Sequence, residues 1–294
     1  MKQALIGIIG GTGLGQALGA LGEGETLALE TPFGPPSGPI VRTEVQGVQV
    51  ALLSRHGEGH LFNPSRVPYR ANIFALKSIG VTHILASAAV GSLREEIAPG
   101  HLVIPDQVID KTTSRPRTFF DELAVHVEFA APFCSSLRAL LLGAGQYAST
   151  VVHPRGTYVC MEGPQFSSRA ESDLHRSWGA ELIGMTALPE AKLAREAEIC
   201  YALVALATDY DCWRPHPAEV DKAALLQEII ANLQTATRHA LDLIRRALPQ
   251  VAGRQESCPC QSALELAIWS DRKAIPKEVR KRLATLLGKY LPVD

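Results

Sequence analysis

The sequence predicts an α/β fold, because short apolar segments alternate along the chain with longer segments of helical periodicity. The clearest strand covers residues 201–208, an almost entirely apolar run without a turn residue, which is typical of a strand buried on both faces. The clearest helix covers 221–247, where apolar residues recur at helical spacing and Pro249 follows. A chain of 294 residues, 46% of them hydrophobic, is large enough for one such domain and does not require a second.

The remaining strands are expected wherever an apolar run of strand length lies between glycine, proline or polar residues. In chain order, the expected strands cover residues 4–9, 40–45, 48–54, 82–88, 101–109, 156–161, 181–184 and 200–208.

The helices are expected between these strands and at the end of the chain. The first follows the chain-stopping Asn63-Pro64, with Ser65 as its N-cap, and Gly80 ends it. The last is expected to present an apolar stripe on an otherwise basic surface. In chain order, the expected helices cover residues 65–80, 132–146, 167–178, 187–198, 221–247 and 276–290.

Two segments lack a regular pattern. Residues 112–131 show no periodicity and predict a long loop, and loops of that length are often functional or packed on a neighbour. Residues 250–262 predict a polar linker to the last helix. We therefore expect a main domain over 1–249 and a helical extension over 250–294, packed on the same domain or on a neighbouring subunit.

Composition excludes several classes of protein. The net charge of −1 and the pI near 6.8 argue against a nucleic-acid partner or an anionic membrane surface. The first residues predict a strand, so no signal peptide is expected, and the apolar runs are too short to span a bilayer. Six cysteines in a chain of this length do not form a secreted disulfide scaffold. A cytoplasmic protein is expected.

Two acidic residues follow the most apolar strand. Asp209 and Asp211 are two positions apart, so in an extended chain their side chains point to the same side, about 6.5 Å apart. Open α/β sheets bind ligands at the carboxyl ends of their strands. A pair of acids there suits a flat ligand such as the N7 and 6-amino edge of adenine, whereas the alternative is a turn with two solvated aspartates.

Four other predicted strands end in residues that suit an anion. Gly10-Gly11-Thr12-Gly13 follows the first, Arg55-His56 a second, Ser87-Ala88-Ala89 a third and Met185-Thr186 a fourth. Backbone N–H groups freed by glycine, hydroxyl groups and a guanidinium together form an anion cradle. If the anion is phosphate, no protein nucleophile is needed.

These segments resemble the purine nucleoside phosphorylase family, in its methylthioadenosine branch. The similarity extends in family order over roughly residues 4–213, which is far more specific than one short motif. It rests on IGIIGGTGLG (6–15), TPFGPPS (31–37), SRHGEGH (54–60), NPSRVPYRANIFALKSIG (63–80), GSLREEIAPG (91–100), MEGPQFSSRAES (161–172) and GMTALPEAKLAREAEICYA running into ATDYDCW (184–213).

The resemblance implies a single-domain, three-layer nucleoside phosphorylase fold with a mixed central sheet flanked by helices. It also implies a glycosyltransferase reaction, in which phosphate attacks C1' of S-methyl-5'-thioadenosine and releases adenine and 5-methylthioribose 1-phosphate, a step of purine and methionine salvage. No metal and no organic cofactor are expected, because phosphate is a co-substrate. A homotrimer is expected, and whether two trimers pair stays open.

The resemblance also assigns residues to phosphate. The implied phosphate site consists of Thr12, Arg55, His56, Ala88, Ala89 and Thr186. Many relatives carry a hydroxyl residue where this chain has Ala88, so one phosphate donor is missing. Ser87 points to the opposite side of the strand and is not an obvious substitute. Weaker phosphate binding is expected, rather than new chemistry.

The base and ribose are assigned to a second set, which consists of Phe166, Ser167, Met185, Asp209 and Asp211. Phe166 either faces the purine or packs in the core. Asp209 is the expected general acid at N7, its pKa raised by Asp211, and Asp211 is expected to accept from the 6-amino group. An apolar 5' pocket is implied at Val220 and Ala223, with His126 reaching in from a neighbouring subunit; the alternative is that His126 is a buried or solvated histidine.

Other functions were weighed against this one. A 6-oxopurine nucleoside or 5'-methylthioinosine phosphorylase shares the fold, but the acidic pair favours a 6-amino base. The GGTGLG segment does not fit the G-x-G-x-x-G dinucleotide pattern. A non-catalytic nucleoside-binding protein would need no phosphate cradle. Cys258 and Cys260 without two further ligands are a weak zinc signal, and the other cysteines are expected to be small core residues.

Overall fold

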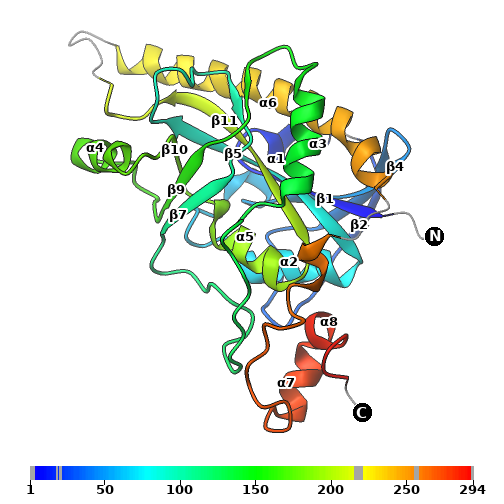
Figure 1. The fold of residues 1–294 in the computed structure, drawn as a ribbon. Helices are drawn as coiled ribbons and strands as arrows, with labels where there is room; N and C mark the ends of the chain where they lie inside the picture. The colour runs from blue at the N-terminus through cyan, green and yellow to red at the C-terminus, as the bar shows by residue number, and fades with distance from the viewer. Residues whose placement is uncertain (1–3, 18, 20–21, 215–220, 255–257, 293–294) are drawn as a thin grey trace.

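The computed structural model describes residues 4–17, 19, 22–214, 221–254 and 258–292 (Figure 1). Its strands form one mixed sheet, in which eight of the described strands lie in the order β2-β3-β4-β1-β5-β10-β9-β7. These are β2 (Glu25–Leu27), β3 (Ile40–Val45), β4 (Val48–Ser54), β1 (Leu5–Gly10), β5 (Val81–Ser92), β10 (Leu182–Gly184), β9 (Thr157–Met161) and β7 (Gln107–Lys111).

The sheet forks at β5, which is its longest described strand. The first half of β5 pairs in parallel with β1, and its last residues pair with β10 in antiparallel orientation, while β11 (Cys200–Tyr210) pairs with it in parallel along almost its whole length. From β11 the branch continues to β6 (Leu102–Val103) and β8 (Val152–His153). The fork leaves the ends of β1, β5, β10 and β11 facing one space, which suits a ligand site.

Helices cover both faces of the sheet, so the fold has the three layers that the resemblance implied. Alternate residues of β11 divide between two cores. Ala202 and Val204 pack in the core with α3 (Ser135–Gly145) and α6 (Lys222–Ala252), whereas Leu203 and Ala205 pack with α2 (Tyr69–Ser78) and α5 (Ala187–Glu196). This alternation is the period of two that a strand buried on both faces requires. The other described helical segments are α1 (Leu14–Ala17), η2 (Glu58–His60), α4 (Arg169–Ser177), η3 (Pro259–Ser262), α7 (Lys277–Arg282) and α8 (Ala284–Leu287).

The predicted strands are found close to their expected positions, with one division. The run 101–109 forms two strands, β6 and β7, on different branches of the sheet, and Pro105 lies between them. Proline lacks the N–H that a continuous ladder needs. The short strands β2 and β8 were not expected from the sequence.

Three predicted helix boundaries were wrong. The first long helix begins at Tyr69 rather than at 65, because Asn63 Oδ1 accepts from the N–H groups of Ser65 and Arg66 and forms a local turn. Helix α6 continues past Pro249 to Ala252, and Val251 in its last turn is fully buried. The last helix divides into α7 and α8 at Leu283.

The C-terminal extension packs on its own chain. Val279, Leu283, Leu286 and Leu287 are buried in the same core as the α2 residues Ile73 and Leu76. The proposed boundary at residue 249 therefore falls inside α6, and the extension beyond it adds to the main core. No helix among the described residues combines the length and apolar character needed to cross a membrane.

We expect the extension to contribute directly to stability. Leu287 is fully buried, so Leu287→Ala should lower the free energy of unfolding by about 2–5 kcal/mol through lost burial and a new cavity. Leu174→Ala, at a side chain that is 44% exposed, should cost less than about 1 kcal/mol. Urea unfolding at one protein concentration measures both, and equal effects would contradict the packing described here.

Candidate active site

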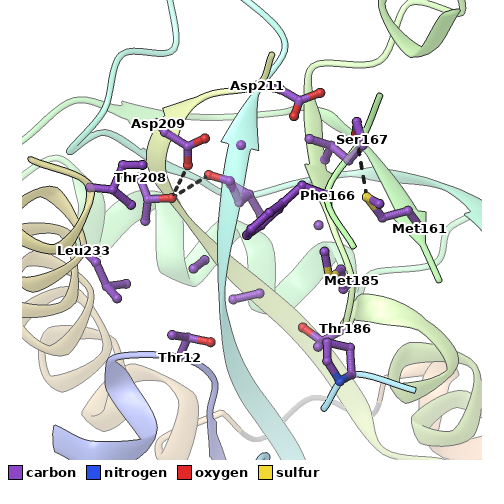
Figure 2. A pocket seen from close by; sticks show the side chains of 18 of the residues that line it. Thr12, Met161, Phe166, Ser167, Met185, Thr186, Thr208, Asp209, Asp211 and Leu233 are labelled. Atoms are coloured by element: carbon purple, nitrogen blue, oxygen red, sulfur yellow. Dashed lines mark hydrogen bonds between the residues drawn. The ribbon is translucent and has the colours of Figure 1, made fainter. Parts of the chain in front are cut away.

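A cavity of about 510 Å³ opens where β1, β5, β10 and β11 end. Its volume suits a small-molecule ligand. Ten of the residues assigned to the site from the sequence line it, namely Thr12, His56, Ala88, Ala89, Phe166, Ser167, Met185, Thr186, Asp209 and Asp211. Figure 2 shows Thr12 and Thr186 at one end of this cavity and Asp209 and Asp211 at the other, so the expected anion and base ends lie opposite each other.

The glycine-rich turn after β1 forms part of the anion end. Gly11 donates its N–H to Ser87 Oγ at 3.2 Å, and a Cβ on Gly11 would lie only 2.5 Å from Ser87 O. Gly13 has φ of 83°, a conformation that glycine adopts without strain. The turn therefore sits directly against β5 and brings Thr12 to the cavity.

Arg55 departs from its expected role. Its side chain is fully buried and it does not line the cavity. Nε and Nη2 donate to the two carboxylate oxygens of Glu190, each at 2.7 Å, and Nη1 donates to Ser87 O at 2.7 Å. Burial alone would lower the pKa of Arg55, but the Glu190 charge raises it above its ordinary value. Arg55 thus joins the middle of β5 to α5 from behind the cavity, through three of the five N–H groups of its guanidinium.

His56 lies on the cavity as expected, in a neutral form. Burial, followed by the Arg55 charge, lowers the pKa of His56 to about 4. Its Nδ1 is 2.7 Å from Phe62 O, so Nδ1 carries the proton and donates, which leaves Nε2 as an acceptor. His60 stacks on it at 4.2 Å and also lines the cavity. A neutral His56 suits a phosphate that still carries a proton to donate.

The base end begins at an irregularity in β11. The register with β5 shifts between Ala207 and Asp209, so Thr208 forms a bulge beside the cavity. The Thr208 hydroxyl is 2.6 Å from Asp209 Oδ1 and 3.3 Å from Val90 O. The hydroxyl donates to the Asp209 carboxylate oxygen over the shorter of these two distances, which holds that side chain beside the cavity. Thr208 was not predicted as a site residue, because a bulge depends on strand pairing and has no signal within the apolar run itself.

Asp211 is largely buried on the lining of the cavity. Its backbone N–H donates to Ser92 O at 2.9 Å, while its Oδ2 has no hydrogen-bond partner among the residues that the structure describes. A buried carboxylate oxygen without a donor is costly, so this atom is suited to accept a hydrogen bond from a ligand.

The wall between the two ends contains Phe166, Ser167 and Met185. Phe166 is 87% exposed, which excludes the alternative that it packs in the core. Ser167 Oγ lies 3.8 Å from the Met161 sulfur, and Ser167 O accepts from the Cys212 thiol. An exposed aromatic ring beside the carboxylates offers a face on which a flat base can stack.

Arg115 supports this wall and was not identified from the sequence. It lies in the irregular segment 112–131 and is almost fully buried. Its guanidinium donates to the backbone carbonyl oxygens of Glu162, Met185 and Leu188 and to the Glu162 carboxylate. The long loop therefore holds two segments that form the wall in register.

The expected 5' pocket is only partly described. Ala223 is exposed at the start of α6 and does not line the cavity, and Val220 lies outside the described residues. The apolar contribution of α6 comes instead from Ile229 and Leu233, four positions apart on one face. The assignment of Ala223 was therefore wrong. The helix contacts the cavity about two turns further on, at Ile229 and Leu233, and not at its first turn.

His126 does not reach the cavity of its own chain. Its side chain is exposed and packs edge-on against the Trp269 ring, with 4.8 Å between ring centroids, and its backbone N–H donates to Ala267 O. Its expected contact with the site would have to be made on a neighbouring subunit.

The ion pair between Arg55 and Glu190 should be essential for stability. Glu190→Gln leaves the guanidinium buried without its counter-charge and should lower the free energy of unfolding by about 3–5 kcal/mol. Asp121→Asn breaks an ion pair of similar length with Arg70 at the surface and should cost less than about 1 kcal/mol. Chemical unfolding compares them, and a small loss in Glu190→Gln would show that the pair is dispensable.

The comparisons with known proteins agree with this geometry. The family model described as "Phosphorylase superfamily" matches residues 5–249. The S-methyl-5'-thioadenosine phosphorylase of Geobacter sulfurreducens is 49% identical over 98% of this chain and 100% of its own, and that of Chloroflexus aurantiacus is 49% identical over 99% of each. A methylthioadenosine phosphorylase from an antarctic soil metagenomic library has a TM-score of 0.87 at 46% identity, covering 98% of this chain and 100% of its own. An adenosine/methylthioadenosine phosphorylase variant from Schistosoma mansoni, in complex with adenine, has a TM-score of 0.84 at 32% identity, covering 91% of this chain and 99% of its own. The chain therefore belongs to the phosphorylase superfamily.

Proposed function

We propose that this protein catalyses the phosphorolysis of S-methyl-5'-thioadenosine to adenine and 5-methylthioribose 1-phosphate. The observation that carries the proposal is the division of one cavity into an anion end around Thr12 and Thr186 and an acidic end around Asp209 and Asp211. The relatives named methylthioadenosine phosphorylases support the choice of nucleoside.

The reaction follows from what the two ends hold. Phosphate binds to the hydroxyl groups of Thr12 and Thr186 and to the backbone around Ala88 and Ala89, close to His56. One phosphate oxygen attacks C1' of the sugar as the bond from C1' to N9 of adenine breaks. Negative charge develops on the leaving base, and a protonated Asp209 relieves it by donating to N7. The hydrogen bond from the Thr208 hydroxyl to Asp209 Oδ1 positions this carboxyl group at the base end of the cavity.

Asp211 selects the base in this proposal. A 6-amino group donates a hydrogen bond to the free Oδ2 of Asp211, whereas the oxygen of a 6-oxopurine would face it as a second acceptor. Phe166 stacks on the purine and Met185 lies under the ribose. The apolar side chains of Ile229 and Leu233 favour an S-methyl group over a 5'-hydroxyl.

The assembly and the location of the protein belong to the same proposal. A homotrimer would bring His126 and the neighbouring Trp269, which is 72% exposed, to the cavity of the next subunit. A cytoplasmic location suits a reaction between a free nucleoside and inorganic phosphate.

Adenine release from methylthioadenosine, measured with and without phosphate, tests the proposal. We expect rapid release that requires phosphate and yields one 5-methylthioribose 1-phosphate for each adenine. Release without phosphate would indicate a hydrolase. Binding without release would indicate a nucleoside-binding protein, and release only from methylthioinosine or inosine would indicate a 6-oxopurine phosphorylase.

The general acid can be tested by removing its proton. Asp209→Asn should lower kcat by about 100- to 10,000-fold, because an amide cannot protonate N7 in the same way. Asp242→Asn, an exposed change on α6, should leave kcat unchanged. Steady-state kinetics at saturating phosphate measure both, and near-normal turnover of Asp209→Asn would rule out this acid.

The missing hydroxyl at the anion end can be restored. Ala88→Thr adds a donor beside the phosphate and should lower the KM for phosphate by roughly 5- to 10-fold, which corresponds to about 1 kcal/mol for one added hydrogen bond. Ala88→Val has nearly the same shape without the donor and serves as the matched control. An equal effect of both variants would mean that shape, not hydrogen bonding, limits phosphate affinity.

A further inference from the structure

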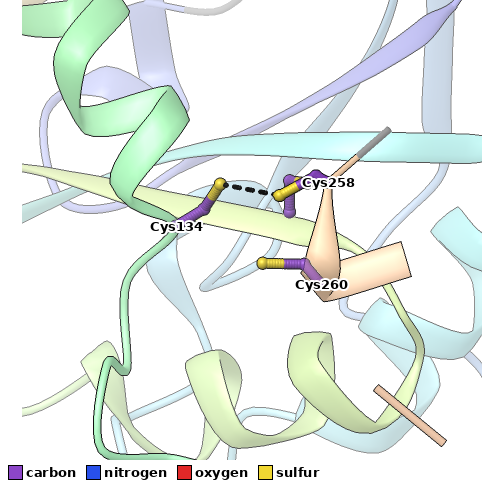
Figure 3. Close-up of side chains that lie close together, drawn as sticks. Cys134, Cys258 and Cys260 are labelled. Carbon is purple, nitrogen blue, oxygen red and sulfur yellow. Dashed lines mark hydrogen bonds between the residues drawn. The ribbon is translucent and has the colours of Figure 1, made fainter. Parts of the chain in front are cut away.

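Four cysteines from three distant parts of the chain meet behind the sheet. Cys134 directly precedes α3 and Cys200 is the first residue of β11, while Cys258 directly precedes the turn η3 of the C-terminal extension and Cys260 lies in it. Their sulfur atoms all lie within 4.8 Å of one another, and all four residues are buried. Figure 3 shows the sulfurs of Cys134, Cys258 and Cys260 pointing into one shared space. We call this group the four-cysteine cluster; none of its members lines the cavity described above.

The spacing of the sulfurs matches metal coordination. Zinc binds four thiolates at about 2.3 Å in a tetrahedron, which places neighbouring sulfurs about 3.8 Å apart. The sulfurs of Cys134 and Cys258 are 3.6 Å apart. A disulfide would require about 2.05 Å, so these two sulfurs lie at the distance of two ligands of one ion rather than of a bonded pair.

We propose that the four-cysteine cluster binds one structural Zn²⁺ ion. Four S–H bonds are replaced by four Zn–S bonds, and four protons leave to solvent, so the site carries a net charge of −2. No electrons are exchanged. All four positions are protein ligands, which leaves no open position for water and makes the site structural rather than catalytic.

The ion would join three elements that are otherwise held by packing and by the hydrogen bond from the Cys134 backbone N–H to Tyr201 O. It ties the start of α3 and the turn η3 to the first residue of β11, and the far end of the same strand carries Asp209 and Asp211. Loss of the ion should therefore loosen the C-terminal extension and lower stability, while the cavity keeps its own residues. The proposal does not depend on which nucleoside the cavity binds.

Metal analysis of the full-length protein tests the proposal. Protein purified under reducing conditions, reconstituted with zinc and freed of excess metal should contain about one zinc per chain by elemental mass spectrometry, as a closed four-thiolate site requires. All six cysteines should react as thiols after denaturation with a chelator. Absence of zinc, iron in its place, or a mass lower by two hydrogens for each of two disulfides would each overturn the proposal.

Matched variants locate the ion. The double variant Cys258→Ser/Cys260→Ser should fall from about one zinc per chain to near zero, whereas Cys160→Ser, at a buried cysteine outside the cluster, should retain it. If the double variant does not fold, cobalt substitution of the wild-type protein decides the matter. A thiolate-to-cobalt charge-transfer band of a tetrahedral site supports the proposal, and its absence overturns it.

Discussion

The buried ion pair between Arg55 and Glu190 is the interaction on which the site depends. Arg55 follows β4, Glu190 lies in α5, and the same guanidinium donates to Ser87 O at the middle of β5. Tyr201 of β11 adds its hydroxyl to Glu190 at 2.8 Å. One fully buried charge pair thus holds three strands of the sheet and the helix α5 together directly behind the cavity. Removing either partner would leave the other charge buried, without a counter-charge and without hydration, which is strongly destabilising.

The fork of the sheet explains why the two ends of the cavity differ. Strand β5 is shared by β1, β10 and β11, so the glycine-rich turn after β1 lies beside its middle, at Ser87, and the acidic end of β11 lies beside its last residues. The bulge at Thr208 then brings a hydroxyl next to Asp209, while Asp211 remains buried with one oxygen unpaired among the described residues. A buried polar atom that lacks a hydrogen-bond partner in the protein is best explained by a ligand that supplies that hydrogen bond.

The sequence predicted those parts of the site that follow directly from strand ends. Thr12, Thr186, Asp209 and Asp211 each come just after, or at the end of, an apolar run, so the predicted strands and the family resemblance together assigned them to one edge of the sheet. What it did not predict depends on long-range pairing. Arg55 resembled an anion ligand until its partner Glu190, 135 positions away, was known.

Irregular and helical segments contain the other site residues that could not be predicted from the sequence. Arg115 lies in a stretch with no periodicity, so nothing local marked it as buried. Which residues of α6 line the cavity depends on how that helix crosses the sheet, and the helical period does not specify this. The four cysteines likewise come together only through the packing of distant segments, which their positions in the sequence do not indicate.

The central claim is that Asp211 Oδ2, which has no partner among the described residues, accepts a hydrogen bond from the 6-amino group of the base. The most direct measurement is kcat/KM for methylthioadenosine and for methylthioinosine in the wild-type protein and in Asp211→Asn. We expect the ratio between the two substrates to move toward the 6-oxopurine by about 100-fold or more, because an amide can donate to the 6-oxygen. An unchanged ratio would contradict the account.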